Sequence, residues 1–167
     1  MTLTSSSRAK VSLPTDEQIL IEREFDAPRH LVYAAFTTPE LVKRWWHAKR
    51  GEVTVAEIDL RVGGKWRYVM VCPDGTEVGF HGEYREVVPA ERLVSTEVYE
   101  GLPEGVSEED AATVDTTTFA GAEGRTTLKI LVQAKSKVAR DAIIESGMED
   151  GLQDALDLLE EAAASLA

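Results

Sequence analysis

The sequence has little cysteine, few long apolar runs and little positive charge, and each of these deficits excludes a class of protein or site. Cys72 is the single cysteine, which excludes an intramolecular disulfide and a cysteine-based zinc site. No apolar run approaches the ~20 residues of a membrane-spanning helix, and no apolar signal segment stands at the start, so we expect a cytoplasmic location. The net charge of −12 would repel phosphates, so neither nucleic acid nor a membrane is an expected partner.

Residues that could carry metal or catalytic chemistry are also sparse. The three histidines, His30, His47 and His81, show no spacing typical of metal ligands. No carboxylate pair, Ser/His/Asp set or cofactor motif can be assembled from the sequence. We therefore expect no metal and no cofactor, and we assign no catalytic residue.

The chain length and composition indicate one globular domain. With 167 residues and 43% hydrophobic residues, the chain can bury a single ordinary core. Residues 1–17 show neither helical nor strand periodicity, which is typical of a flexible leader. Residues 18–167 are then the domain.

The last stretch of the chain predicts a long amphipathic helix, beginning near Ser146. Its apolar residues recur at three- and four-residue steps and form one stripe: Met148, Leu152, Ala155, Leu156, Leu159, Ala163 and Leu166. We expect Leu152 and Leu159 to be buried, and Glu149 and Asp157 to lie on a solvated face. About 18 to 20 helical residues span ~30 Å, so this helix needs a large partner surface.

The residues before that helix predict strands and short helices. Strands are expected at 19–25, 53–60, 65–72, 77–88, 92–99, 114–119 and 126–132, with helices starting at Pro28 and Pro39 and a third at 137–144. Six consecutive strands joined by short turns must pair antiparallel, because parallel pairs need long crossovers. The predicted fold is α+β: a helix-grip, in which a seven-stranded antiparallel sheet wraps around the C-terminal helix and two short helices follow the first strand.

The strand at 65–72 predicts which side chains face the interior. Trp66, Tyr68 and Met70 alternate with Lys65 and Arg67, so the aromatic face should point inward under the final helix. The inward registers of 77–88 and 92–99 stay open. Only His81 among the histidines is a candidate to face a cavity. The expected cavity wall consists of Trp46, Trp66, Tyr68, Met70, His81, Tyr84, Met148, Leu152 and Leu156.

Trp45 and Trp46 are adjacent in the second helix. Neighbouring helical residues point about 100° apart, so both rings cannot fill one site. We expect one to anchor the helix to the sheet and the other to lie at the mouth of the cavity.

Several short motifs occur in the order seen in a known family: Phe25-Asp26-Ala27-Pro28, Ala35-Phe36-Thr37-Thr38-Pro39-Glu40, Trp45-Trp46, Asp59-Leu60-Arg61-Val62-Gly63-Gly64, Pro73-Asp74-Gly75, Gly82-Glu83-Tyr84-Arg85-Glu86-Val87 and Ser146-Gly147-Met148-Glu149-Asp150-Gly151. Through them the chain resembles the SRPBCC (START-like, birch-pollen-allergen-like) superfamily. Within it, the match is to the group named for the activator of heat-shock-protein-90 ATPase. The resemblance implies a seven-stranded sheet that grips the C-terminal helix around an internal cavity.

The resemblance leaves three functions open, because this superfamily includes carriers, cyclases and a co-chaperone. The leading hypothesis is non-catalytic binding of an apolar or aromatic small molecule in the cavity. The alternatives are a co-chaperone-like activator of heat-shock-protein-90 ATPase and a polyketide cyclase-like enzyme using Tyr84, Glu83 and His81. The expected partner is thus a small apolar ligand, with a chaperone as the alternative, and both a monomer and a homodimer are compatible with the sequence.

Overall fold

The computed structural model describes residues 8–167, which form one curved sheet and a set of helices. The strands are β1 (Lys10–Ser12), β2 (Gln18–Phe25), β3 (Glu52–Ile58), β4 (Lys65–Val71), β5 (Glu77–Val88), β6 (Arg92–Tyr99), β7 (Thr113–Ala120) and β8 (Thr126–Gln133). The helices are α1 (Arg29–Thr37), α2 (Pro39–Trp45), α3 (Glu108–Ala111), α4 (Lys137–Glu145) and α5 (Met148–Ala164).

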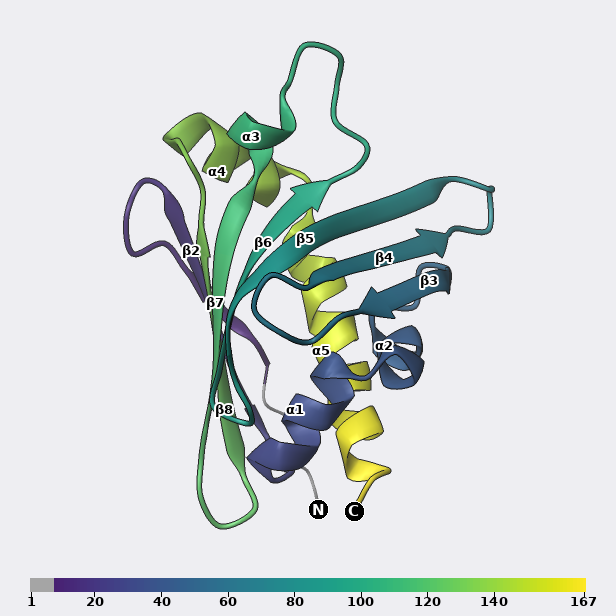
Figure 1. The fold of residues 1–167 in the computed structure, drawn as a ribbon, viewed down its shortest axis with the longest axis vertical. Helices are drawn as coiled ribbons and strands as arrows, with labels where there is room; N and C mark the ends of the chain where they lie inside the picture. Colours follow the sequence, from purple (N-terminus) through teal and green to yellow (C-terminus); the bar gives the residue numbers. More distant parts are fainter. Residues whose placement is uncertain (1–7) are drawn as a thin grey trace.

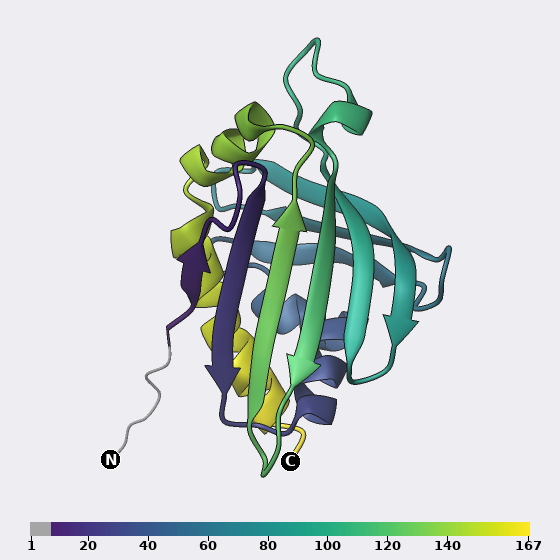
Figure 2. The same cartoon turned by 90° about the vertical axis from the view of Figure 1, so that its left-hand side faces the viewer.

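The sheet has the predicted antiparallel meander. Its strand order is β1-β2-β8-β7-β6-β5-β4-β3, so β3 to β8 pair in sequence and β2 adds beside β8 (Figures 1 and 2). The hairpin between β4 and β5 closes through Gly75, whose φ of 89° is the left-handed conformation that glycine adopts without strain. The helix-grip prediction is confirmed in class and in connectivity.

The sheet has eight strands rather than the predicted seven, because the expected leader contributes β1. Lys10 pairs with Glu22 and Ser12 with Leu20. The side chain of Gln153 on α5 then binds both backbone groups of Ala9: its Oε1 accepts from the amide at 2.9 Å, and its Nε2 donates to the carbonyl at 2.8 Å. A three-residue strand is too short to show a period, so sequence reasoning missed it. Residues 1–7 of the expected leader lie outside the described residues.

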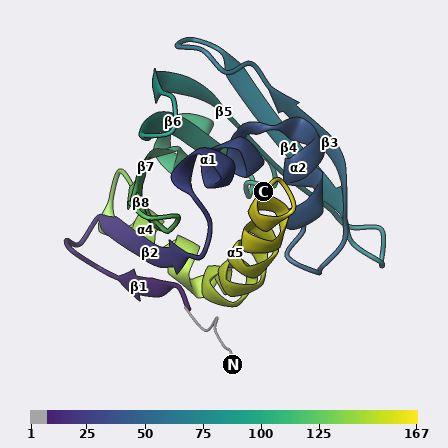
Figure 3. The same cartoon turned by 90° about the horizontal axis from the view of Figure 1, so that it is seen from below.

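Helix α5 lies in the concave side of the sheet, with α1 and α2 next to it (Figure 3). Leu156 and Leu159 are 2% and 0% exposed, as expected for the apolar stripe. Two members of the stripe are less buried than predicted. Leu152 is only partly buried against the core, and Leu166 is 40% exposed because α5 ends at Ala164.

An ion pair joins the first long strand to α5. Arg23 faces inward on β2 with its side chain 1% exposed, and its guanidinium lies 2.6 Å from Asp157 and 3.2 Å from Glu160. The same guanidinium carbon lies 5.0 Å from the centre of the Phe25 ring. Asp157, expected on a purely solvated face, is therefore a structural partner of a buried cation.

The burial of α5 gives a graded prediction for stability. We expect Leu159→Ala to lower the free energy of unfolding by ~2–5 kcal/mol, because it leaves a cavity in a closed core. Leu152→Ala should cost clearly less, since this side chain is already partly exposed, and Glu149→Ala should stay within about 0.5 kcal/mol. Urea unfolding of the three variants measures the order. Equal losses for Leu152→Ala and Leu159→Ala would contradict it.

The Arg23 ion pair gives a second prediction. We expect Asp157→Ala to destabilise the protein by ~1–3 kcal/mol, because a buried guanidinium loses one of its two acceptors. Asp150→Ala, an exposed change in the first turn of the same helix, is the control for lost charge. Thermal unfolding of both variants decides the question: an Asp157→Ala protein as stable as the control would mean that Glu160 alone satisfies Arg23.

Candidate functional site

The inner face of the sheet, defined as the face that packs against α5, carries the expected side chains of β4. Trp66, Tyr68 and Met70 are 7%, 8% and 9% exposed, whereas Lys65 and Arg67 are exposed on the outer face. The predicted inward direction of this strand is confirmed.

Trp66 is locked into the packing of the sheet. Its indole Nε1 donates to the carbonyl of Thr96 at 3.2 Å, over Gly82 of the neighbouring strand. A Cβ at Gly82 would lie 1.8 Å from that carbonyl oxygen and 2.6 Å from Nε1, so glycine leaves the space that the indole occupies. This is the environment of a structural tryptophan.

The two adjacent tryptophans have different surroundings, as expected, but the one that anchors the second helix packs on the first helix. Trp45 is 6% exposed, stacks on Phe36 at 5.5 Å and donates from Nε1 to the carbonyl of Ala35 at 2.9 Å. It therefore anchors α2 to α1 rather than to the sheet. Trp46, only partly buried, is the ring that meets the sheet.

Trp46 belongs to an interior aromatic group that runs from the core toward solvent. Its ring centre lies 5.6 Å from that of Tyr68 and 5.8 Å from that of Phe80. Phe80 in turn lies 5.1 Å from Tyr99, which is 40% exposed. We define the interior aromatic group as Trp46, Tyr68, Phe80 and Tyr99. The group combines buried and solvent-reached apolar surface, as the wall of a binding site does.

The remaining expected wall residues fall into two sets. Tyr84 and Leu156 are buried in the core, at 5% and 2% exposure, and Met148 and Leu152 are partly buried against it.

The prediction that His81 lines the cavity is wrong. It pairs with Arg67 across β4 and β5, which places it on the outer face. Side chains alternate along a strand, so Tyr84 faces inward whereas Glu83 and His81 face outward, and the proposed cyclase set does not converge.

His81 instead joins an ion cluster on the outer face. Glu100 accepts from Arg67 at 2.9 Å and lies 2.9 Å from Nδ1 of His81, while Nε2 of His81 lies 3.4 Å from Glu108 on α3. The Arg67 hydrogen bond is the main cause that lowers the pKa of Glu100 to about 2. This cluster ties the loop after β6 to the sheet.

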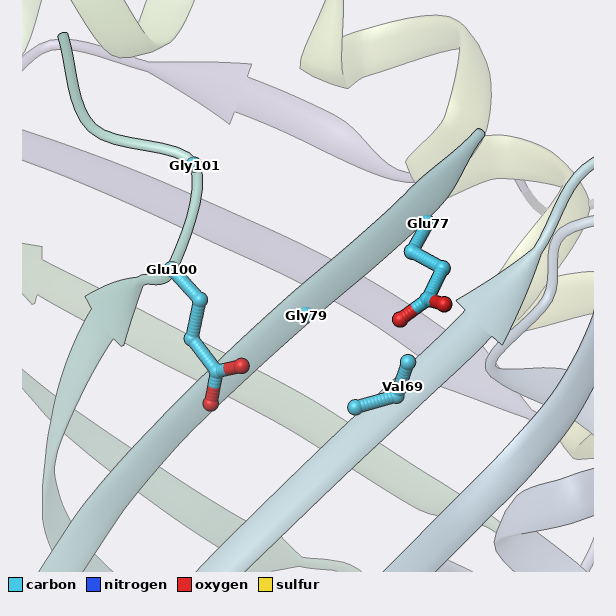
Figure 4. Close-up of a pocket in the computed structure, with 5 residues that line it drawn as sticks. All are labelled: Val69, Glu77, Gly79, Glu100 and Gly101. Atoms are coloured by element: carbon cyan, nitrogen blue, oxygen red, sulfur yellow. The ribbon is translucent and has the colours of Figure 1, made fainter. Parts of the chain in front are cut away.

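A shallow hollow lies beside this cluster, lined by Val69, Glu77, Gly79, Glu100 and Gly101. Figure 4 shows the carboxylates of Glu77 and Glu100 on either side of Gly79. Its volume of about 200 Å³ is small for a site that encloses an organic ligand. Within residues 8–167, no group of three or more His, Cys, Asp or Glu side chains is placed to hold a metal ion.

Two carboxyl groups on the inner face were missed by sequence reasoning. Ser95 pairs with Asp115 and Glu97 with Thr113, so Glu97 and Asp115 both point inward from β6 and β7. Burial raises the pKa of both carboxyls, and that of Glu97 is raised furthest, with the Asp115 carboxylate and their shared hydrogen bond adding to the effect. Asp115 Oδ1 also accepts from the Thr113 hydroxyl at 2.8 Å.

In addition to the carboxyl groups of Glu97 and Asp115, the inner side of the protein carries tyrosine hydroxyls. Burial raises the pKa of Tyr68 well above its usual range, with Tyr84 and Glu97 adding to the effect. Burial likewise raises the pKa of Tyr84 to about 12. The Tyr33 hydroxyl is buried without a hydrogen-bond partner among the described residues. The interior is thus apolar on its aromatic side and offers protonated hydroxyl and carboxyl groups on the other.

This architecture, a curved antiparallel sheet closed by one long C-terminal helix, defines the helix-grip class of proteins. The sequence matches a family model described as "Activator of Hsp90 ATPase homolog 1-like protein" over residues 26–164. The chain belongs to that family, and the resemblance seen in its short motifs is confirmed.

Solved structures with the same fold come from several bacteria. A protein from Rhodobacter sphaeroides is 26% identical with a TM-score of 0.84, and the match covers 95% of this chain and 99% of that chain. A protein from Chromobacterium violaceum is 28% identical with a TM-score of 0.74, over 89% and 98% of the two chains. An AHSA1-like protein from Aeromonas hydrophila, 22% identical with a TM-score of 0.68 over 89% and 93%, shares the fold. No curated protein matches the sequence.

The helices of the described residues were compared with the requirements for spanning a membrane. None of those in residues 8–167 combines the length and the apolar character that crossing a bilayer requires.

The inward-facing carboxyl pair of Glu97 and Asp115 predicts an unusual dependence of stability on pH. Glu97 stays protonated in the folded protein at a pH where the unfolded chain, with a glutamate pKa of ~4.3, has lost that proton. The folded state then binds more protons, so stability falls as pH rises from about 4.3 to the raised pKa. We expect Glu97→Gln, whose amide can still donate to Asp115, to raise the melting temperature at pH 7 and to lose most of that advantage at pH 4. A gain of equal size at both pH values would contradict this assignment.

Proposed function

We propose that this protein binds an apolar or aromatic small molecule, without chemical conversion, between the inner face of its sheet and α5. The observation that carries the proposal is the interior aromatic group. Trp46 and Phe80 face the core yet remain partly exposed, and Tyr99 extends the same surface outward. Apolar surface that the fold itself does not cover favours a ligand.

Binding is the better proposal than catalysis or chaperone activation. The candidate cyclase residues lie on opposite faces of the sheet, so they cannot act on one substrate. Activation of a chaperone ATPase rests on the description of the family, and members of one fold family differ widely in function. That alternative has its own signature: the protein would raise the ATP turnover of the chaperone, and a Trp46→Ala variant would do so equally well.

The neutral fluorescent probe N-phenyl-1-naphthylamine tests the binding proposal. We expect saturable brightening with the wild-type protein and weaker binding to Trp46→Ala. Removing ~60–100 Å² of apolar contact costs about 1.5–2.5 kcal/mol, which is roughly a tenfold to sixtyfold loss of affinity.

The control for this experiment is Val62→Ala, which shortens a side chain that is 64% exposed in the β3–β4 loop and away from the interior. It should leave the probe affinity unchanged. Cooperative unfolding of each variant must be verified, because a loosened core also brightens such dyes. Equal affinity of wild type and a folded Trp46→Ala would remove the interior aromatic group from the site, and absence of saturable binding to wild type would contradict the proposed function.

A further inference from the structure

One imidazole ring joins both ends of the segment that leads from β6 into α3. Nδ1 of His81 lies 2.9 Å from the carboxylate of Glu100, which directly follows β6, and Nε2 lies 3.4 Å from the carboxylate of Glu108, which begins α3. We define residues 100–108 as the β6–α3 segment. Figure 1 shows this segment rising beyond the end of the sheet before the chain returns through α3. Its two ends are thus held by one side chain of β5.

Protonation decides how many of these contacts the ring can make. A neutral imidazole has one N–H and donates to one carboxylate, whereas the imidazolium donates from both nitrogens. Histidine is the side chain that usually changes its charge between pH 5 and 8. Glu100 is also held by Arg67, which donates to its two oxygens at 2.9 Å from Nε and Nη2. Glu108 lies further from the ring and is 67% exposed, so it is the contact that the neutral imidazole gives up.

The surroundings of His81 place the effect of its charge on the β6–α3 segment. His81 faces four charged side chains on the outer face of the sheet, one cation and three carboxylates: Arg67, Glu83, Glu100 and Glu108. The residue opposite on β6 is the apolar Val98. The arginine and the first glutamate lie in paired strands, and the backbone N–H after β6 still donates to the carbonyl of Gly79 at 2.8 Å. The α3 end of the segment is therefore the part that a change of charge releases first.

The residue just before the β6–α3 segment belongs to the interior aromatic group. Tyr99 points to the inner face, is 40% exposed, and has its ring centre 5.1 Å from that of Phe80. The same ring lies against Gly101, where a Cβ would be 2.5 Å from the ring carbon Cζ and from the hydroxyl oxygen. Figure 4 shows Glu100 and Gly101 following one another at this point. Movement of the segment therefore frees the most exposed ring of the interior aromatic group.

We propose that the β6–α3 segment is a cover for the interior site, and that the protonation of His81 controls its closure. The imidazolium, present at acidic pH, holds both Glu100 and Glu108 and closes the cover. The neutral ring releases Glu108, so the cover loosens as the pH rises. This inference rests on the proposed function and adds its regulation: a bound ligand exchanges more slowly at acidic pH.

The size of the effect follows from the exposure of the contact. An ion pair at the surface is weak, so we expect changes of about twofold to fivefold in the rates that the cover controls. Measurements at pH 5.5 and 8.0 span the range in which histidine usually titrates, and both values lie above the range for glutamate.

Nuclear magnetic resonance of the free protein tests the contact without any ligand. The backbone N–H groups of Ala111 and Ala112 donate to the carbonyls of Ser107 and Glu108 in α3. A helix of four residues is not stable without tertiary contacts, so these amides report whether α3 is held on the sheet. We expect their protection factors, which are corrected for the intrinsic pH dependence of exchange, to be about twofold to fivefold higher at pH 5.5.

Stopped-flow fluorescence with N-phenyl-1-naphthylamine, which is uncharged at both pH values, tests the cover. We expect association and dissociation both to be about twofold to fivefold faster at pH 8.0, with the affinity changed by less than about twofold. A cover that gates access changes both rates together. A charge inside the site, such as that of Glu97, would change the affinity instead.

Two variants remove the contact from either side. His81→Gln cannot be protonated, and Glu108→Gln keeps the length of the side chain without its charge, so each should lose the pH dependence in both measurements. The controls make the same changes elsewhere: His30→Gln at an exposed position of α1, and Glu109→Gln at the next exposed residue of α3. Both controls should keep the wild-type pH dependence.

The outcomes separate this proposal from the one on which it rests. Equal protection of α3 at the two pH values, a pH dependence that survives in either variant, or its loss in either control overturns the role of His81. Saturable probe binding with rates that do not change with pH overturns the cover and leaves the small-molecule site intact. Absence of saturable binding contradicts the proposed function and the cover with it. If His81→Gln does not unfold cooperatively, Glu108→Gln decides.

Discussion

The cover that one helix can give to a wide sheet is the constraint on which the rest of this structure depends. Helix α5 has 17 residues, or about 26 Å at 1.5 Å per residue. Eight strands at ~4.8 Å spacing make a sheet more than 30 Å across, even before its curvature is counted. Helices α1 and α2 complete the cover on one side (Figure 3). The inner face of β4 to β6 is left with Phe80 and Tyr99 incompletely covered, and the candidate site lies there.

The same alternation that builds the core also sorts the polar residues. On β5, Phe80 and Tyr84 face inward while His81 and Glu83 face outward, so neighbours in sequence have different surroundings. Arg67, His81 and Glu100 form an exposed ion cluster that salt can screen, and such a cluster contributes little to stability. Glu97 and Asp115, one strand further, lie on the inner face, where burial raises the pKa of both carboxyls. The inner face is therefore where a single charge has large effects.

Sequence patterns predicted the class of fold and one strand of the site, for identifiable reasons. The strand from Lys65 alternates aromatic and charged residues, and its inward face was predicted from that period alone. The strands at 77–88 and 92–99 lack such alternation, and a register shift between Tyr84 and Glu86 changes the pairing midway, so their inner residues could not be predicted. For that reason Phe80, Tyr99 and Glu97 were missed and His81 was misplaced. Strand β1 has three residues and is stabilised by a contact with Gln153, which no local pattern reveals.

The polar groups of the interior also bear on the function that we propose. A stable sequence satisfies its buried polar groups from within, and the departures from that rule are most often found at functional sites. Here the terminal nitrogens of Arg23 have two carboxylate partners, whereas its Nε and the Tyr33 hydroxyl have no partner among the described residues. Protein sequences commonly leave stabilising changes unused where activity needs the destabilising group. The scaffold itself is shared across bacterial relatives at about a quarter sequence identity, so the binding that we propose has to be argued from the inward side chains of β5, β6 and β7 and not from the fold.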